Sequence, residues 1–367
     1  MPKKKPPTKL PYKGWTPMKD GVTQSLLQKF KVDKDRAHKH VVRGLRETNR
    51  KEAMEYGSIF HKLIEVGSLM GKKYTRSKML EAAKLLFQEK LRDEESAMLV
   101  KIAIAQYDKY RVWEKTRPQY KVLEAEPVFR ENLKLPAFHF NPNDCVSLRV
   151  PENTIIPLRG RIDEVLEIDG GMWIQENKTK SRINVQFLQE TVPCNLQVMF
   201  YALCSELKYG RPCRGVIYNV IRKPGLRQKV KESDKEFIDR IAEDIDAQPD
   251  HYFIRFKYEF TQNDVKIWLK EELLPLLYEV FFWWKSIEKN PLEPWGSEDV
   301  PNPLHGRKSF GIYDGMHDGK GDFYELIVNN KKTDLVVSNE LFPELADEND
   351  EMIAVCKQIG IPIKKGK

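Results

Sequence analysis

The sequence predicts a mixed α/β fold, with a central mixed sheet flanked by helices, a helical N-terminal part and a small C-terminal extension. Three observations favour this fold class. Apolar residues recur at helical spacing over about residues 22–115. Short β-branched runs broken by turn residues, which are typical of strands, occupy about 119–180. Helical spacing then returns on both sides of one further strand-like run, and this order of elements is typical of mixed α and β folds.

The predicted helices of the N-terminal part have recognisable starts and apolar stripes. Thr23 can cap a short helix that runs through Phe30, because a threonine side chain accepts a backbone N–H at a helix start. A second helix is predicted from Glu52 through Leu69. Two more are predicted from apolar residues at helical spacing, one with Met79, Ala82, Leu85 and Leu86 and one with Leu99, Ala103, Tyr107 and Tyr110.

The predicted sheet begins with three strand-like runs, VLEAEPVF at 122–129, LRGRIDEVLEI at 158–168 and MWIQENKT at 172–179. The sequence Asp-Gly-Gly at 169–171 predicts a hairpin between the last two. The later elements are expected to be a helix at about 190–208, a strand at 215–221 and helices at about 233–246 and 263–289. The chain has no internal repeat.

The hairpin brings three charged residues together in either of two registers. If the two glycines form the turn, residue 163 lies opposite 178; if Asp169 and the first glycine form it, residue 163 lies opposite 176. In both registers Asp163, Glu176 and Lys178 share one face, because side chains alternate along a strand. Directly opposite residues are roughly 5 Å apart, so two carboxylates can share one cation. Oxygen ligands of this kind favour Mg²⁺ or Mn²⁺ over zinc.

A solvated charge cluster is the alternative interpretation of these three residues. However, Val165, Met172 and Ile174 fall on the same face and indicate that it is partly buried. Carboxylates placed together on such a face repel each other unless a cation neutralises them. We therefore favour a metal site.

Composition favours a folded protein that is neither secreted nor membrane-bound. The 367 residues are 41% apolar, which allows a sizeable core. We find no run of about 18 apolar residues and no apolar stretch typical of a signal peptide at the N-terminus, and so expect a cytoplasmic location. The five cysteines are scattered without a C-x-x-C pair, which predicts ordinary reduced thiols.

Positive charge is concentrated near the N-terminus. Residues 1–50 contain fourteen Lys and Arg against four Asp and Glu, whereas the whole chain has a net charge of +8. A segment that includes Lys3, Lys4 and Lys5 suits a phosphate backbone, because neutralised phosphates release counterions. A solubilising tail remains an equal alternative.

Asp163 followed by Glu176-Asn177-Lys178 resembles the signature of the PD-(D/E)XK nuclease superfamily, in particular its RecB-like branch and related phage-type exonucleases. Two flanking helices also fit the family pattern, with Gly57-x-x-x-His61 upstream and Gln197-x-x-x-Tyr201 downstream. The resemblance covers about residues 22–285. It implies a restriction-endonuclease-like fold, Mg²⁺ or Mn²⁺ as cofactor, and DNA with single- or double-stranded ends as partner.

The resemblance also divides the chain into three parts. Residues 1–20 are expected to form a basic flexible arm. Residues 21–295 are expected to form the PD-(D/E)XK nuclease domain, helical over 21–117 and containing the catalytic sheet and helices over 118–295. Residues 296–367 are expected to form a C-terminal loop and extension.

The expected metal ligands are Asp163, Glu176 and the backbone carbonyl of Asn177. His61 is expected as a further ligand, and Glu65 is one helical turn later on the same face. Taken alone, His61 would fit a structural role better than a metal site; the carboxylate pair downstream reverses this preference and favours the metal.

Three roles are open for Lys178, which can position water, deprotonate it or stabilise the transition state. Gln197 and Tyr201 are expected to orient substrate phosphate or Lys178, with a hydrogen-bonded pair at the core margin as the alternative. Lys180 and Arg182, just past the motif, are expected to contact nucleic acid.

One departure from the family is informative. Several RecB-like nucleases hold an iron–sulfur cluster with four cysteines, but here Phe30 is followed by Lys31-Val32-Asp33 and residues 302–310 contain no cysteine. We therefore expect a relative without a cluster.

The expected function is metal-dependent hydrolysis of DNA phosphodiester bonds, as an exonuclease in recombination, repair or phage DNA processing in a bacterial or phage-infected cell. One alternative is a non-catalytic nucleic-acid-binding or scaffold protein that retains the fold, and another is an unrelated metal-dependent phosphoesterase. Trp283 and Trp284 can stack on bases, but their helical setting favours core packing.

Overall fold

The computed structural model describes residues 15–32, 34–42, 44–46, 52–140, 148–261, 263–287, 336–337, 342, 345 and 349–361. The predictions for Lys3, Lys4 and Lys5 and for most of the C-terminal loop and extension at 296–367 lie outside these residues. The chain divides into two compact units. The first comprises Met1–Asn49, Phe129–Gly160 and Asn263–Ala346, and the second Arg50–Val128, Arg161–Gln262 and Asp347–Lys367.

The first unit contains a three-stranded sheet in the order β1-β7-β4, in which β1 is parallel to β7. Thr23 caps the helix that follows β1, since its hydroxyl accepts the N–H of Leu26 over 3.2 Å, as predicted. Trp283 and Trp284 are both only 4% exposed, which confirms core packing. The elements of this unit are α1 (Pro17–Asp20), β1 (Val22–Thr23), α2 (Gln24–Val32), α3 (Lys34–Ala37), a π-helical segment (His38–Val42), β2 (Leu45–Arg46), β4 (Val128–Lys134), β5 (Phe138–Phe140), β6 (Leu148–Val150), β7 (Ile155–Arg161), α11 (Asp264–Trp268), a second π-helical segment (Leu269–Leu273), α12 (Leu274–Ile287) and β12 (Val336–Val337).

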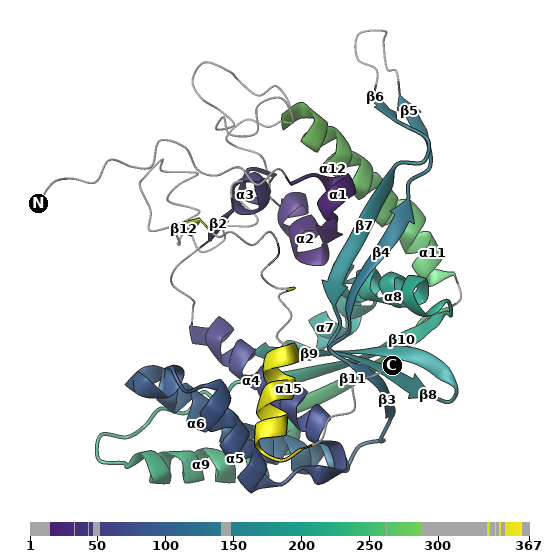
Figure 1. The fold of residues 1–367 in the computed structure, drawn as a ribbon. Helices are drawn as coiled ribbons and strands as arrows, with labels where there is room; N and C mark the ends of the chain where they lie inside the picture. The colour runs from purple at the N-terminus through teal and green to yellow at the C-terminus, as the bar shows by residue number, and fades with distance from the viewer. Residues whose placement is uncertain are drawn as a thin grey trace, which may run out of the picture. The chain divides into compact units, whose positions relative to one another are not determined.

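The second unit is built on a five-stranded mixed sheet in the order β11-β10-β9-β8-β3 (Figure 1). Strands β9 and β10 are parallel, and the other neighbours are antiparallel. This is the mixed sheet flanked by helices that the sequence predicts. The elements are α4 (Glu52–Met70), α5 (Arg76–Leu86), α6 (Glu94–Lys115), β3 (Lys121–Ala125), β8 (Glu164–Ile168), β9 (Gly171–Lys180), α7 (Val185–Thr191), α8 (Leu196–Tyr209), β10 (Cys213–Arg222), α9 (Asp234–Ala247), α10 (Pro249–Tyr252), β11 (Phe253–Glu259), α15 (Asn349–Gln358) and 3₁₀ turns at Gly71–Lys73, Lys90–Arg92 and Val192–Cys194.

The hairpin between β8 and β9 adopts the second of the two predicted registers. Ile168 pairs with Gly171, so Asp169 and Gly170 form the turn. Both turn residues have positive φ, 50° and 72°, as a type I′ turn requires. The ladder ends at the pair of Glu164 with Gln175, one residue short of Asp163.

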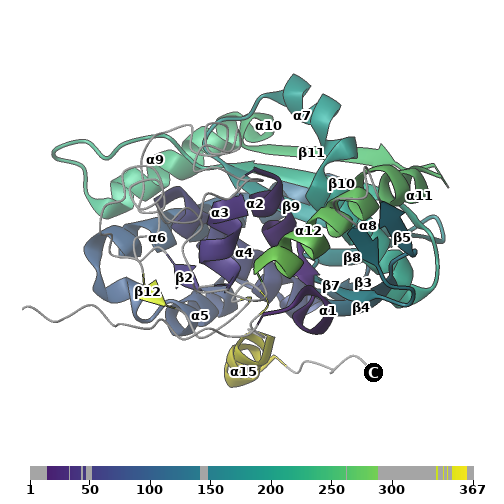
Figure 2. The ribbon, with the colours of Figure 1, turned by 90° about the horizontal axis from the view of Figure 1, so that it is seen from above.

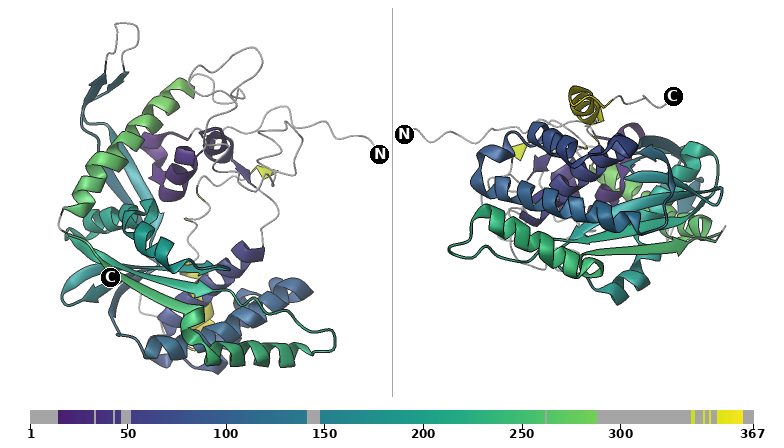
Figure 3. Two further views of the ribbon diagram at one scale, coloured as in Figure 1. Left: turned by 180° about the vertical axis from the view of Figure 1, so that it is seen from behind. Right: turned by 90° about the horizontal axis from the view of Figure 1, so that it is seen from below.

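Helices cover both faces of this sheet (Figures 1 and 3). Helix α8 packs on one face of β9 and β10, whereas α4 packs on β9 and, with α5, α6, α9 and α15, forms a large hydrophobic core. Helix α9 leads through α10 into the edge strand β11 (Figure 2). A side chain at Gly57 would approach the hydroxyl of Thr179 to 2.7 Å, so this glycine allows α4 to lie close to β9.

Several predicted elements differ from the observed ones. The helix at 190–208 is wrong at its start, because Pro193 lies in a 3₁₀ turn and Asn195 caps a separate helix, α8. The single strand at 158–168 is two strands, β7 and β8, separated at Ile162 and Asp163. Strand β11 was not predicted. Within the described residues, no helix is both long and apolar enough to cross a membrane.

Candidate active site

Asp163 lies where the chain leaves one sheet and enters the other. Its carbonyl accepts the N–H of Glu126 over 2.8 Å, which fixes the backbone at this break. Because the β8–β9 ladder has already ended, the side chain of Asp163 takes the place of a strand partner and accepts the N–H of Asn177 over 2.6 Å. The carboxylate is therefore held at the edge of β9, beside the residue between Glu176 and Lys178.

Glu176 is the centre of a chain of polar contacts on the face of β9 that α8 covers. Its Oε2 accepts hydrogen bonds from Lys178 Nζ at 2.8 Å and from Gln197 Nε2 at 3.0 Å. Tyr201, one turn beyond Gln197 on α8, shares a side-chain hydrogen bond with Gln197. Asn195 positions this helix, because its side chain accepts the N–H groups of the first turn. The structure thus joins four of the predicted residues by direct contacts.

The second carboxylate oxygen of Glu176, Oε1, is buried and has no hydrogen-bond partner among the residues that the structure describes. The residue is completely buried, and this burial raises the pKa of Glu176 to about 8, with nearby Asp163 adding to the rise and Lys178 opposing it. Burial alone would lower the pKa of Lys178, but the carboxylates of Glu176 and Asp163 outweigh it and raise that pKa above its usual value. A cationic lysine and an under-satisfied carboxylate therefore lie side by side.

His61 approaches the same place from α4. Its Nδ1 lies 3.8 Å from Asp163 Oδ2, and its side chain keeps 31% of its surface exposed. Burial lowers the pKa of His61, and the opposing effect of Asp163 is smaller. A ring N–H of His61 also donates a hydrogen bond to the backbone carbonyl of Asn177, and this bond raises the pKa of His61. His61 is therefore neutral at pH 7, which is the form that binds metals.

Three further predicted residues are Glu65, Lys180 and Arg182. Glu65 is buried, and its charge raises the pKa of Glu126. Lys180 and Arg182 are exposed at and just past the end of β9.

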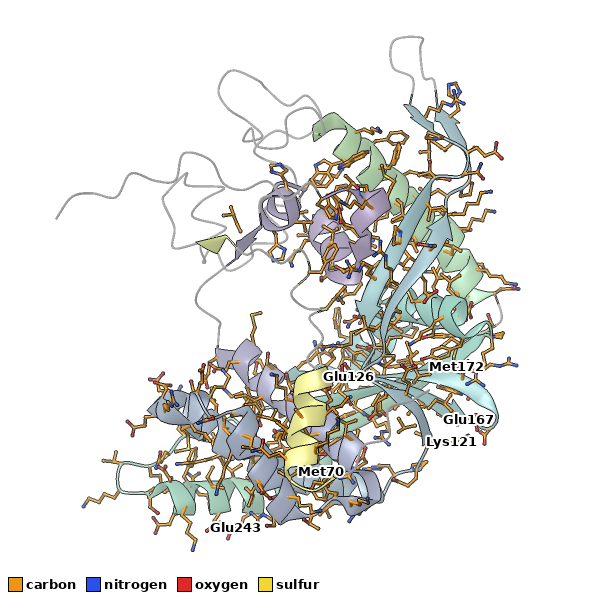
Figure 4. The ribbon with its side chains drawn as sticks, in the orientation of Figure 1. Met70, Lys121, Glu126, Glu167, Met172 and Glu243 are labelled. Atoms are coloured by element: carbon orange, nitrogen blue, oxygen red, sulfur yellow. The ribbon has the colours of Figure 1, made fainter. Side chains whose placement is uncertain are left out.

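Glu126 is a neighbour of the site that the sequence did not reveal. It is 8% exposed, and its Oε2 lies 3.2 Å from Arg161 Nε (Figure 4). Burial, followed by Asp163 and Glu65, raises the pKa of Glu126 well above its usual value. Its backbone has a φ of 50°, which is uncommon for a residue other than glycine. The one sequence signal is an acidic residue before Pro127 inside a strand-like run, and it is weak.

The opposite face of the strand carries a row of polar residues across three strands. Asn177, Asn219 and Arg255 occupy matching register positions on β9, β10 and β11. Asn219 Nδ2 donates to Asn177 Oδ1 at 2.8 Å, and Arg255 Nε donates to Asn219 Oδ1 at 2.7 Å. Only Asn177 Nδ2 in this row is buried without a partner. Glu164 lies on the same face, and its two oxygens accept from Ser68 and Gln175, each at 2.6 Å.

The donor set suits a hard divalent cation. Within the described ranges, no three His, Cys, Asp or Glu side chains gather closely enough to form a complete metal cage. Mg²⁺, however, is usually bound through one or two carboxylates, with water and substrate oxygens supplying the rest. The orphaned Oε1 of Glu176, Asp163 beside it and the Asn177 carbonyl fit this pattern, since a cation would relieve the cost of burying an unpaired carboxylate.

A cavity of about 510 Å³ lies at the other end of β9, beside the hairpin turn, and contains none of these residues. Its lining includes Trp173, Arg211, Arg214 and Lys257.

A family model described as the PD-(D/E)XK nuclease superfamily matches residues 23–265, and the chain belongs to this superfamily. The mixed sheet with helices on both faces is consistent with a restriction-endonuclease-like fold. Members are generally nucleases, which act on nucleic acids, and they typically use divalent metal ions. No curated protein sequence matches the chain. A crystal structure of SSO0001 aligns with 62% of this chain and 85% of its own at 8% identity and a TM-score of 0.27, too loose a likeness to carry an argument.

Proposed function

We propose that this chain is a Mg²⁺- or Mn²⁺-dependent deoxyribonuclease of the RecB-like and phage-type exonuclease branch, which removes nucleotides from DNA ends in recombination, repair or phage DNA processing. One observation carries the proposal, the set of contacts around β9. Lys178 donates to Glu176 at 2.8 Å, and Asp163 accepts the backbone N–H of the residue between them at 2.6 Å. Gln197 donates to Glu176 at 3.0 Å, and His61 lies 3.8 Å from Asp163. The exonucleolytic mode is based on the resemblance of the motifs.

In this proposal Asp163, Glu176 and the Asn177 carbonyl hold the cation, with His61 beside them. When bound, the cation activates a water molecule and offsets the charge that develops on the phosphate. Lys178 remains protonated at neutral pH because two carboxylates surround it, which favours charge stabilisation over proton abstraction as its role.

Gln197 and Tyr201 orient these groups in the proposed site. Gln197 and Lys178 donate to the same oxygen of Glu176, which leaves Oε1 available for another ligand. Tyr201 in turn bonds to Gln197, and burial, followed by the charge of Glu176, raises the pKa of Tyr201 well above its usual value. Its hydroxyl therefore stays neutral and serves as a hydrogen-bonding group.

A cleavage assay tests the proposal. End-labelled linear DNA and closed circular DNA are incubated with the full chain and Mg²⁺, Mn²⁺ or EDTA. We expect loss of linear DNA from its ends with either metal, intact circles, and no reaction in EDTA. Nicked or linearised circles would replace the exonuclease with an endonuclease. Absence of any cleavage, with DNA binding retained, would support the non-catalytic alternative.

A further inference from the structure

The C-terminal ends of β9 and β10 lie side by side, close to the proposed active site. The two strands are parallel, and their last register pair is Lys180 with Arg222. The N–H of Lys223 then donates to the carbonyl of Lys180 over 2.9 Å. Lys178 is two residues before this end, or about 7 Å along the strand. The segment that leaves β10, residues 223–231, therefore starts beside the proposed catalytic lysine.

Residues 223–231, here called the basic loop, contain four Lys and Arg and no Asp or Glu. Lys223 is paired with Glu52 at the base of the loop. Arg227, Lys229 and Lys231 are exposed, and no ion pair joins them to an acid within the described part of the chain. The loop projects beyond the end of α9 (Figure 2).

A side chain of α9, that of Arg240, holds the basic loop in its conformation. Arg240 makes two hydrogen bonds to the carboxylate of Glu232, each 2.7 Å long, and donates to the carbonyl of Arg227 at 2.9 Å. Glu232 also accepts the N–H of Lys229 at 2.8 Å. The carboxylate of Glu232, which follows the loop, thus accepts its hydrogen bonds from Arg240 and from the loop backbone, and not from the cationic side chains of the loop.

Two further cations lie at the same end of the sheet. Lys180 ends β9 and Arg182 follows it, and both are exposed without an ion pair among the described residues. Together with the three side chains of the basic loop they make five exposed positive charges on the two segments that leave the C-terminal ends of β9 and β10, with no ion pair among the described residues. Contacts of Lys and Arg to phosphates carry no sequence information, so a surface that binds through them binds without regard to sequence.

We propose that the basic loop, with Lys180 and Arg182, binds the phosphate backbone of the nucleic acid on the side of the active site where β9 and β10 end. The inference rests on the proposed nuclease function for the identity of its ligand. The alternative, a solvated surface loop, does not explain why its flanking acid is held by Arg240 while three cations stay unpaired.

DNA binding in EDTA tests this inference without cleavage. A fluorescein-labelled 20-nucleotide DNA, single-stranded or duplex, is titrated with the full chain over a range of NaCl concentrations. The loop variant carries Arg227→Gln, Lys229→Gln and Lys231→Gln. We expect at least a tenfold loss of affinity at 0.1 M NaCl. The slope of log K against log[NaCl] should become shallower by about 2–3, since each lost phosphate contact removes about 0.7–0.9.

A matched control has the same change in net charge. Lys73→Gln, Lys84→Gln and Lys115→Gln remove three other exposed charges of the second unit, on the turn after α4, on α5 and at the end of α6. We expect less than a twofold change in affinity. Equal losses in the two triple variants, or an unchanged salt slope in the loop variant, would overturn the inference.

Glu232→Ala separates loop shape from total charge. The variant gains one positive charge overall, so electrostatics alone would tighten DNA binding, whereas release of the loop from Arg240 should weaken it about threefold or more. Tighter binding would show that the contacts of Arg240 with the loop have no role in DNA binding. Failure of the nuclease proposal is distinguishable, because a chain that never cleaves DNA but loses binding in the loop variant would still support the loop.

Discussion

Two buried glutamates on neighbouring strands, Glu176 of β9 and Glu164 of β8, differ in how their oxygens are satisfied. On the face under α8, Glu176 is wholly buried, and its Oε1 has no partner among the described residues. On the opposite face, Glu164 is also buried, but both of its oxygens accept hydrogen bonds. Buried polar groups are normally bonded, and an unbonded carboxylate oxygen can be satisfied by a cation, which supports the proposed metal site. The unbonded Nδ2 of Asn177 on the opposite face is a donor and cannot bind a cation.

The largest expected effects come from removing the carboxylates of the proposed metal site. Asp163→Ala and Glu176→Ala should each reduce cleavage by about a thousandfold or more, because each deletes a charged ligand of that proposed site. Mn²⁺ affinity, measured by calorimetry, should fall as well. Binding of DNA in EDTA is the control and should change little. Near-normal cleavage by either variant would remove these residues from the site.

A smaller effect is expected from the row of polar residues behind the site. Asn219→Leu leaves Asn177 and Arg255 without their shared partner, which should cost about 1–3 kcal/mol of stability and about tenfold in cleavage rate. Gln106→Leu is the control, since it also removes hydrogen bonds of a buried side chain, one from the Tyr56 hydroxyl and one to the carbonyl of Arg222, outside this row. Urea unfolding and cleavage rates are compared for both variants. Equal loss of rate in both would show that the row has no special role.

The two buried glutamates should respond to amidation to different extents. The pKa of Glu176 is about 8 in the folded state against 4.5 ordinarily, so between these pH values only the folded state keeps the proton and stability falls as pH rises. Glu176→Gln should therefore stabilise the metal-free protein at pH 8, on the order of 2–4 kcal/mol, and much less at pH 5. Burial also raises the pKa of Glu164, but only to about 7, so Glu164→Gln should stabilise the protein less at pH 8 than Glu176→Gln does. Thermal unfolding in EDTA at both pH values decides this, and an equal or larger gain from Glu164→Gln would contradict the comparison.

The sequence predicted the parts of the fold and site that depend on local pattern. The Asp-Gly turn, the alternation along β9 and the helix beginning at Glu52 all follow from near neighbours in the chain. The break at Asp163 and the edge strand β11 could not be predicted from near neighbours, because they depend on which sheet each segment joins. Glu126 was missed for a similar reason, since its burial and positive φ arise from tertiary packing around Asp163. The Asn177–Asn219–Arg255 row requires the pairing of strands 36 or more residues apart.

The central claim is that Lys178 takes part in the cleavage reaction, whereas the carboxylates of Asp163 and Glu176 bind the metal. Calorimetric titration of Lys178→Ala with Mn²⁺, combined with the end-labelled DNA assay on the same preparation, tests it most directly. We expect cleavage to be abolished while Mn²⁺ binds as tightly as in the wild type or more tightly, because a positive charge 2.8 Å from Glu176 has been removed. Cleavage by Lys178→Ala at near the wild-type rate would contradict the account and favour a non-catalytic role for this fold.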